Sequence, residues 1–142
     1  SQLMPLSKIS IIATDIDKEA MAKAQNGIYS ENSLKNVPSN IASKYFTKIT
    51  DKTYSISDEI KKCVTFKQHN LLKDKFVDSC DLIVCRNVLI YFTEEAKTEI
   101  YTNFSRSLIS EGILFVGSTE QIISPQKYNL QPIKTFFYTK SI

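Results

Sequence analysis

Short runs of hydrophobic residues along the chain end at polar residues and alternate with amphipathic segments. The apolar run at 9–13 predicts a strand, which Asp15 and Asp17 close. Residues 17–27 then predict a helix, because alanine and methionine side chains recur on one face. Asp17 can cap its first turn, and Gly27 stands where a left-handed residue ends a helix. The pattern therefore predicts a strand, an acidic turn and a helix.

The middle of the chain is less regular. Residues 30–46 predict a loop followed by a short helix that starts near Pro38. The β-prone residues of segment 48–56 surround a polar turn and predict a small hairpin. Ser57 is expected to cap one or two helical turns, after which a strand from Val64 ends at the polar pair His69 and Asn70.

The second half alternates strands and helices more clearly. Residues 81–85 form an apolar run, typical of a parallel strand covered on both faces. Segment 93–112 predicts the clearest helix, which Thr93 caps and Gly112 stops. Two more strands are expected, a buried one at 113–118 and an edge strand at 134–140. Strands that alternate with helices indicate an α/β fold with a largely parallel sheet.

The composition of the chain disfavours a nucleic-acid-binding protein, a membrane protein and a metalloprotein. A chain of 142 residues is long enough for one domain with its own core. A net charge of +3 with interleaved signs does not favour a nucleic-acid partner. No apolar run reaches the roughly 20 residues that span a bilayer, so no membrane insertion is expected. Three cysteines without metal-ligand spacing and a single histidine predict reduced thiols, no metal site and a cytoplasmic protein.

Polar residues gather at three predicted strand ends, and ligands of open α/β sheets bind at such ends. A carboxylate there can accept both ribose hydroxyls, and an amide can read an adenine edge. Each residue alone also fits an ordinary structural role: a helix cap, a turn, a surface ion pair or a core tyrosine. The three pairs are Asp15 with Asp17, His69 with Asn70, and Arg86 with Asn87. With only three glycines, the chain lacks a dinucleotide fingerprint or a P-loop.

Several segments resemble one family in order along nearly the whole chain. They are ATDID, GIY, LKNVP, KYF, HNLL, DLIVCRNVLIYF, GILFVGSTE and FFY. Together they resemble the CheR family of chemotaxis receptor methyltransferases, protein-glutamate O-methyltransferases that use S-adenosylmethionine. The resemblance implies a Rossmann-like class I methyltransferase sheet, mostly parallel with an antiparallel last strand. It also implies that residues 1–142 are a partial catalytic domain with a small β insertion around 45–66.

The resemblance assigns roles to six residues. Asp15 matches the acidic residue that takes the ribose hydroxyls, and Tyr91 matches a tyrosine beside the transferred methyl. The other four positions match residues that lie against the adenine or line the cofactor site: Asn70, Leu71, Arg86 and Asn87. The implied partner is the cytoplasmic helical region of methyl-accepting chemotaxis receptors, whose glutamates are ionised at pH 7.

The chain also departs from the family. It begins after the family's N-terminal helical domain and first strand, a central strand of the sheet. We therefore expect an incomplete sheet, an inactive fragment, and strand exchange or self-association as a candidate mode of assembly. Hairpin 48–56 lacks the glycine-rich turn of members that tether to receptor tails. Two alternatives stay open: a non-catalytic cofactor-binding or protein-interaction module of the same fold, and a small-molecule methyltransferase.

Overall fold

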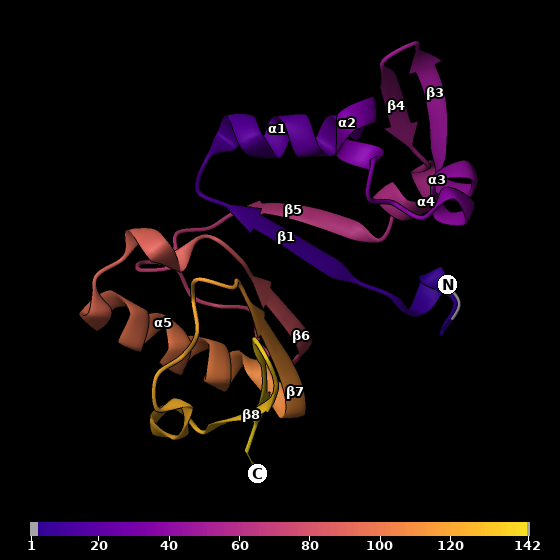
Figure 1. The fold of residues 1–142 in the computed structure, drawn as a ribbon. Helices are drawn as coiled ribbons and strands as arrows, with labels where there is room; N and C mark the ends of the chain where they lie inside the picture. The colour runs from indigo at the N-terminus through magenta and orange to yellow at the C-terminus, as the bar shows by residue number, and fades with distance from the viewer. Residues whose placement is uncertain (1–2, 142) are drawn as a thin grey trace. The chain divides into compact units, whose positions relative to one another are not determined.

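The computed structural model describes residues 3–141 of the chain. The chain forms two compact units, residues 1–70 and residues 71–142, coloured from indigo to yellow along the ribbon in Figure 1. Each unit contains at least one sheet and one helix packed on it, so the α/β class expected from the sequence is confirmed. No helix within 3–141 is long and apolar enough to cross a membrane.

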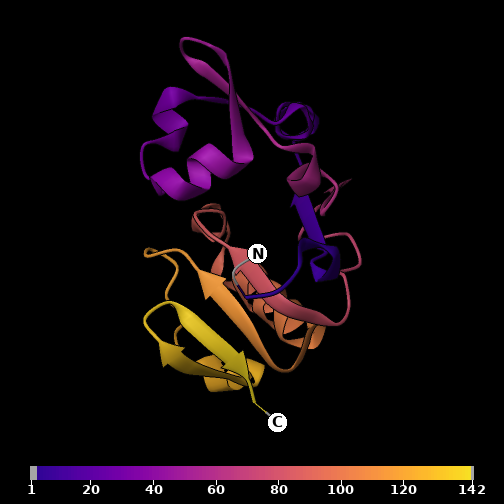
Figure 2. The same ribbon diagram turned by 90° about the vertical axis from the view of Figure 1, so that its right-hand side faces the viewer.

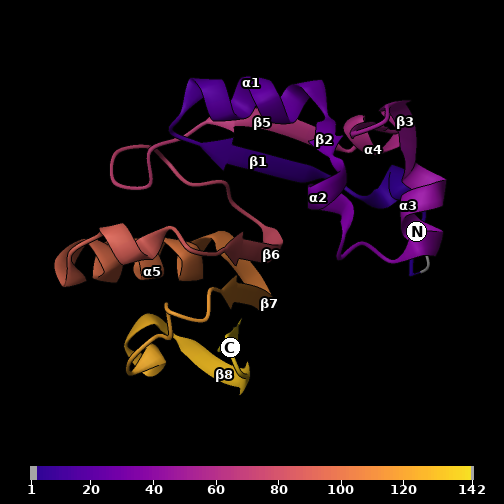
Figure 3. The same cartoon turned by 45° about the horizontal axis from the view of Figure 1, so that its top comes forward.

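The first unit is built on a pair of parallel strands. A short 3-10 turn, η1 (Leu6–Lys8), precedes β1 (Ile11–Asp15), which pairs in register with β5 (Val64–Gln68). Helix α1 (Lys18–Asn26) packs along this pair, as Figures 1 and 3 both show. The predicted strand and helix are confirmed.

Both ends of α1 form as the sequence predicts. Asp17 Oδ1 accepts the backbone N–H groups of Glu19 at 2.8 Å and Ala20 at 3.4 Å. At the other end Gly27 has φ +64°, a left-handed conformation that costs glycine little. A residue with a Cβ there would also collide with the Lys61 side chain.

A second, antiparallel sheet in this unit has the order β2-β4-β3. The expected hairpin is confirmed as β3 and β4, but the first strand was not predicted, because three residues are too few for a periodic pattern. The short helix after Pro38 is confirmed as α3. The bounds are β2 (Ile28–Ser30), α2 (Glu31–Leu34), α3 (Ser39–Tyr45), β3 (Phe46–Thr50), β4 (Thr53–Ile56) and α4 (Asp58–Lys61).

Ser57 is the N-cap of α4, as predicted, but its side chain makes no capping hydrogen bond. Helix α4 does begin after this residue, but its first N–H groups, from Ile60 and Lys61, bond to the Ser57 backbone carbonyl. The Ser57 hydroxyl is buried and has no hydrogen-bond partner among the described residues. The serine therefore starts the helix through its extended backbone conformation alone.

The second unit is a four-stranded mixed sheet in the order β6-β7-β9-β8 with one long helix along it (Figure 2). Strands β6 and β7 are parallel, whereas β9 runs antiparallel to both of its neighbours. The antiparallel last strand is thus confirmed. The elements are β6 (Cys80–Cys85), η2 (Leu89–Tyr91), α5 (Glu94–Ser107), β7 (Leu108–Val116), η3 (Pro125–Tyr128), β8 (Leu130–Lys134) and β9 (Phe137–Lys140).

The main hydrophobic core lies in this second unit, between α5 and the sheet. Ile100 and Phe104 are one helical turn apart and are both buried, as the spacing of apolar residues predicts. They pack with Leu108, Leu114 and Leu130, which are at most 2% exposed. Burying each such leucine contributes roughly 1.5–3 kcal/mol.

Helix α5 begins as predicted but ends earlier. Thr93 Oγ1 accepts the Ala96 N–H at 3.3 Å and caps the first turn. The helix stops at Ser107 rather than Gly112, because Leu108 is already extended and starts β7. Gly112 lies instead in an irregular part of β7, where an added Cβ would come within 3.0 Å of the Cys80 carbonyl.

Two expectations about strands in the second unit are wrong. Strand β9 lies between β7 and β8, so the edge strands of this sheet are β6 and β8. Strand β8 is short and contains Pro132, and the hydrophobic pattern did not predict it. Strand β6 is covered on one face only. Leu82 and Val84 are 56% and 59% exposed, whereas Cys85 on the opposite face is buried beside α5.

Candidate functional site

The first unit brings Asp15 and Asn70 to the same end of its parallel pair. Strand β1 ends at Asp15, whose carbonyl accepts the His69 N–H at 2.9 Å just beyond β5. The Asp15 carboxylate is exposed, and its Oδ1 accepts the Asp17 N–H at 2.9 Å. Gln68 Nε2 also donates to the Ile16 carbonyl at 3.0 Å. This end of the strand pair therefore carries the Asp15 carboxylate, which accepts one backbone N–H, and the half-buried residue Asn70.

The second unit places Arg86 over an aromatic stack. Arg86 directly follows β6, and its guanidinium carbon lies 4.9 Å from the centre of the Phe115 ring. The Phe115 ring stacks on Phe137 with centroids 4.2 Å apart and planes within 6°. None of the ion pairs among the described residues includes Arg86. An aromatic face therefore orients this guanidinium, in place of the surface carboxylate considered from the sequence.

Asn87 follows in a left-handed conformation with φ +59°, which asparagine tolerates better than most residues. A single carboxylate, that of Glu120, holds this turn. It accepts the N–H groups of Asn87 at 2.7 Å, Val88 at 2.7 Å and Leu89 at 2.5 Å. It also accepts the Gly117 N–H at 2.9 Å. Glu120 is 4% exposed, so four hydrogen bonds in a buried setting fix the turn.

Gly117 leaves room for that carboxylate. A Cβ at this position would collide with Glu120 Oε2 and would lie 2.9 Å from Asn87 Oδ1. The Asn87 side chain therefore lies directly beside the Gly117 α-carbon. Within the second unit, Gly117 and Glu120 together form the support on which the Arg86–Asn87 turn rests.

The other two predicted residues are also in the second unit. Tyr91 ends η2 and is 83% exposed. It is therefore not a core tyrosine, the alternative that its apolar neighbours in the sequence left open. Leu71 is half-buried and packs against the hydrophobic core of this unit. The structure thus groups Asp15 with Asn70 in one unit, and Leu71, Arg86, Asn87 and Tyr91 in the other.

Burial and the Glu120 charge raise the pKa values of two nearby side chains, Cys85 and Tyr101. Burial first, and then the negative charge of Glu120, raise the pKa of the Cys85 thiol to about 12. The same two causes, in the same order, raise the pKa of the Tyr101 phenol. Cys85 therefore stays a protonated thiol at neutral pH and is not a nucleophile.

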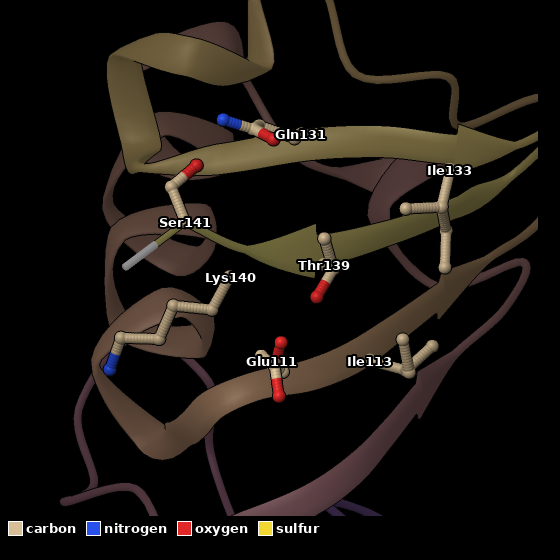
Figure 4. A pocket seen from close by; sticks show the side chains of 7 residues that line it. All are labelled: Glu111, Ile113, Gln131, Ile133, Thr139, Lys140 and Ser141. Carbon is tan, nitrogen blue, oxygen red and sulfur yellow. The ribbon is translucent and has the colours of Figure 1, made fainter.

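A shallow pocket lies elsewhere on the second unit, as Figure 4 shows. Its side chains come from β7, β8 and β9 and from Ser141 just after β9. They include Glu111, Ile113, Gln131, Ile133, Thr139 and Lys140. None of the predicted site residues lines it, and it holds no cluster of titratable groups beyond one acid and one lysine. We do not assign the cofactor site to this pocket.

Comparisons with known proteins match nearly the whole chain. The family described as CheR methyltransferase, SAM binding domain, matches residues 2–137. A chemotaxis protein methyltransferase of Listeria innocua is 40% identical over 131 residues, which cover 92% of this chain and 50% of that protein. Those of Listeria monocytogenes and Borreliella burgdorferi are 39% and 35% identical, over 92% and 94% of this chain and 50% and 47% of those proteins.

These matches define a methyltransferase domain that binds S-adenosylmethionine. The chain belongs to the CheR methyltransferase family, and S-adenosylmethionine is its cofactor. The chain spans about half the length of the curated relatives it matches.

The residues present fit this cofactor chemically. An exposed carboxylate and an amide at one strand end suit a ribose diol and an adenine edge. The Arg86 guanidinium and the Asn87 amide after β6 add donors for polar groups of a ligand. Among residues 3–141, no group of three histidine, cysteine or acidic side chains could hold a metal ion. These residue types suit a nucleoside ligand, with Asp15 and Asn70 in the first unit and Arg86 and Asn87 in the second.

Sequence reasoning missed the residues that support this site. GILFVGSTE was one of the segments that carried the resemblance, yet Glu120 and Gly117 received no role. The available signal was a glycine at a strand end with an acid three residues later, which in a buried setting requires partners. The partners themselves lie 31–33 residues away in the chain, where no local pattern points to them.

Proposed function

We propose that this chain is the cofactor-binding part of a cytoplasmic enzyme that transfers a methyl group from S-adenosylmethionine to glutamate side chains of chemotaxis receptors. The observation that carries the proposal is its 40% identity to a chemotaxis protein methyltransferase over 92% of its length. The polar residues at the ends of β1 and β6 support it, because they have the types that the family resemblance requires at these positions.

In this proposal Asp15 accepts the ribose hydroxyls, and Asn70 and Leu71 lie against the adenine. Asp15 suits its role because its carboxylate is exposed and the Asp17 N–H fixes one oxygen at 2.9 Å. Arg86 and Asn87 line the cofactor site from the turn that follows β6. Tyr91 orients the acceptor or the cofactor near the methyl, and its 83% exposure leaves the phenol accessible to a substrate.

Methyl transfer from a sulfonium to a carboxylate needs few catalytic side chains. The sulfonium of the cofactor supplies an electrophilic methyl group when it is bound. A glutamate acceptor is already ionised at neutral pH, so the protein needs no general base. The residues of this chain bind, orient and exclude water, and the rate comes from positioning. Tyr91 acts as a hydrogen-bonding group that orients the acceptor or the cofactor.

The sheet pieces are also those that a Rossmann-like class I methyltransferase requires. They are two parallel pairs, β1 with β5 and β6 with β7, and the antiparallel β9. We assign both units to the catalytic domain of such a methyltransferase. On this proposal the chain alone is inactive, and the complete gene product binds its cofactor. The hairpin β3–β4 belongs to the small insertion around residues 45–66.

Calorimetric titration with S-adenosylhomocysteine tests the proposal, using the 142-residue chain and the complete gene product side by side. We expect the complete product to bind and to methylate a receptor fragment. Asp15→Asn should weaken binding at least tenfold, because the amide loses one acceptor and the charge. Asp51→Asn is the matched control, since Asp51 is an exposed residue of the β3–β4 turn whose ion pair among the described residues is with Lys48.

The outcomes separate the alternatives. Binding without methyl transfer by the complete product would support a non-catalytic module of the same fold. Methyl transfer to a small molecule but to no receptor fragment would support a small-molecule methyltransferase. If the folded complete product does not bind S-adenosylhomocysteine at all, the proposed function is wrong.

A further inference from the structure

Glu120 is a buried acidic residue that has no role in the proposed binding of cofactor and substrate. Its carboxylate is buried, yet it forms no ion pair with a described residue and does not line the pocket on this unit. All of its described bonds go to backbone N–H groups, three of them consecutive. Burying a carboxylate costs free energy unless hydrogen bonds offset it, and here four of them do.

The three consecutive donors start at the one residue of this turn with a positive φ. Asn87 has φ +59°, and its N–H is held by Oε2, while Oε1 takes the N–H groups of Val88 and Leu89. The chain continues without a break into η2, which ends at Tyr91. Leu89 itself is fully buried, so the turn is fixed on its core side as well. The carboxylate therefore sets the backbone path from Asn87 to Tyr91.

We propose that Glu120 is a positioning residue of the methyltransferase site: its carboxylate presets the left-handed Asn87 turn and thereby aims the Asn87 and Tyr91 side chains before the cofactor binds. This inference rests on the proposed function. Gly117 serves the same arrangement, because its missing side chain admits both Glu120 Oε2 and Asn87 Oδ1. Glu120 touches no ligand in this scheme and acts only through the turn.

The main test is Glu120→Gln in the complete gene product. A glutamine keeps the shape but turns one acceptor oxygen into an NH₂ group, which faces backbone donors and cannot accept from them. We expect the folded variant to bind S-adenosylhomocysteine at least tenfold more weakly, with a matching rise in KM for S-adenosylmethionine. Glu120→Asp, which keeps the charge on a shorter chain, should recover part of the affinity.

Two controls separate positioning from stability. Leu130→Ala removes a fully buried side chain of the same core outside residues 86–91 and 117–120, so it should lower stability and leave the affinity unchanged. Thr119→Ala changes an exposed neighbour of Glu120 and should change neither. If Glu120→Gln is less stable but binds as tightly as the wild type, Glu120 has a structural role only and the inference is overturned.

Amide hydrogen exchange on the wild-type protein tests the inference even if the Glu120 variants do not fold. A preset turn requires that the amides of Asn87, Val88 and Leu89 are protected before S-adenosylhomocysteine is added. Exchange at the rate of an unstructured loop, slowed only by the ligand, would overturn the inference. A wild-type protein that binds no S-adenosylhomocysteine would instead count against the proposed function. The exchange rates of the free protein would still show whether the Asn87 turn is formed without a ligand.

Discussion

Two acidic residues beside strand ends, Asp15 and Glu120, use their carboxylates in opposite ways. Asp15 is exposed, and its carboxylate accepts one backbone N–H in its own turn. Glu120 is 4% exposed and accepts four backbone N–H groups, three of them from a turn more than 30 residues away in the sequence. The exposed acid keeps hydrogen-bonding capacity for a ligand. The buried acid uses its capacity within the protein and shapes the turn that carries other site residues.

The largest expected difference between these acids is in stability. Glu120→Ala leaves up to four N–H groups in a buried setting without an acceptor, and each such group costs about 1–3 kcal/mol. We expect the free energy of unfolding to fall by at least about 4 kcal/mol. Asp15→Ala removes one hydrogen bond at an exposed turn and should cost about 1 kcal/mol or less. Urea unfolding followed by circular dichroism measures both, and equal losses would contradict the comparison.

The next largest effect is a loss of stability at alkaline pH, which comes from the buried Cys85 thiol. Its thiol has a pKa of about 12 in the folded protein, against about 9 in the unfolded chain. The unfolded chain therefore releases this proton first, so stability is fully present below pH 9 and is lost between pH 9 and pH 12. The loss amounts to about 1.4 kcal/mol per pH unit within that window. Tyr101, whose pKa is also raised, acts in the same direction.

Urea unfolding at several pH values between 8 and 11 checks this expectation. In Cys85→Ala the loss of stability with pH should become shallower by about 1.4 kcal/mol per unit. Cys63→Ala is the matched control, because Cys63 lies in the first unit. An unchanged slope in Cys85→Ala would mean that the thiol is not buried beside Glu120 as the structure has it.

A smaller loss is expected at Gly117. In Gly117→Ala the new methyl group collides with the Glu120 carboxylate, which four hydrogen bonds prevent from moving freely. Overpacking of this kind typically costs about 1–3 kcal/mol, so we expect about 2 kcal/mol in urea unfolding. Ser118→Ala, at the exposed neighbouring position, should be within about 0.5 kcal/mol of the wild type. A Gly117→Ala variant as stable as that control would show that the carboxylate has room to shift.

The sequence predicted what depends on local pattern. Helix α1 followed from its apolar face, the Asp17 cap and Gly27, all within eleven residues. Asp15 and Arg86 followed from the rule that ligands bind at strand ends, and the family resemblance gave them roles. Contacts between distant segments were not predictable in this way. Neither the Glu120 bonds to the Asn87 turn nor the stacking of Phe115 on Phe137 leaves a periodic trace.

The errors have the same origin. The end of α5 was placed at Gly112, because glycine is the commonest helix stop, but tertiary pairing of Leu108 with Cys80 ends the helix at Ser107, five residues before the glycine. Strand β8 was missed because it is short, contains Pro132 and exposes four of its five residues, so only pairing with β9 defines it. Local propensity was overruled each time by a partner strand that the local sequence does not reveal.

The smallest effect separates Asp15 from its neighbour Asp17. Asp17 caps α1 with bonds of 2.8 Å and 3.4 Å to the N–H groups of Glu19 and Ala20, so Asp17→Ala should cost about 1 kcal/mol of stability. The Asp17 backbone N–H that orients Asp15 remains in this variant. We therefore expect unchanged affinity for S-adenosylhomocysteine in the complete gene product. Asp15→Asn should do the reverse, weakening the affinity with little change in stability. If Asp17→Ala weakens binding as much as Asp15→Asn, the cofactor is bound by the acidic turn as a whole. The proposal that the Asp15 carboxylate alone binds the ribose would then be wrong.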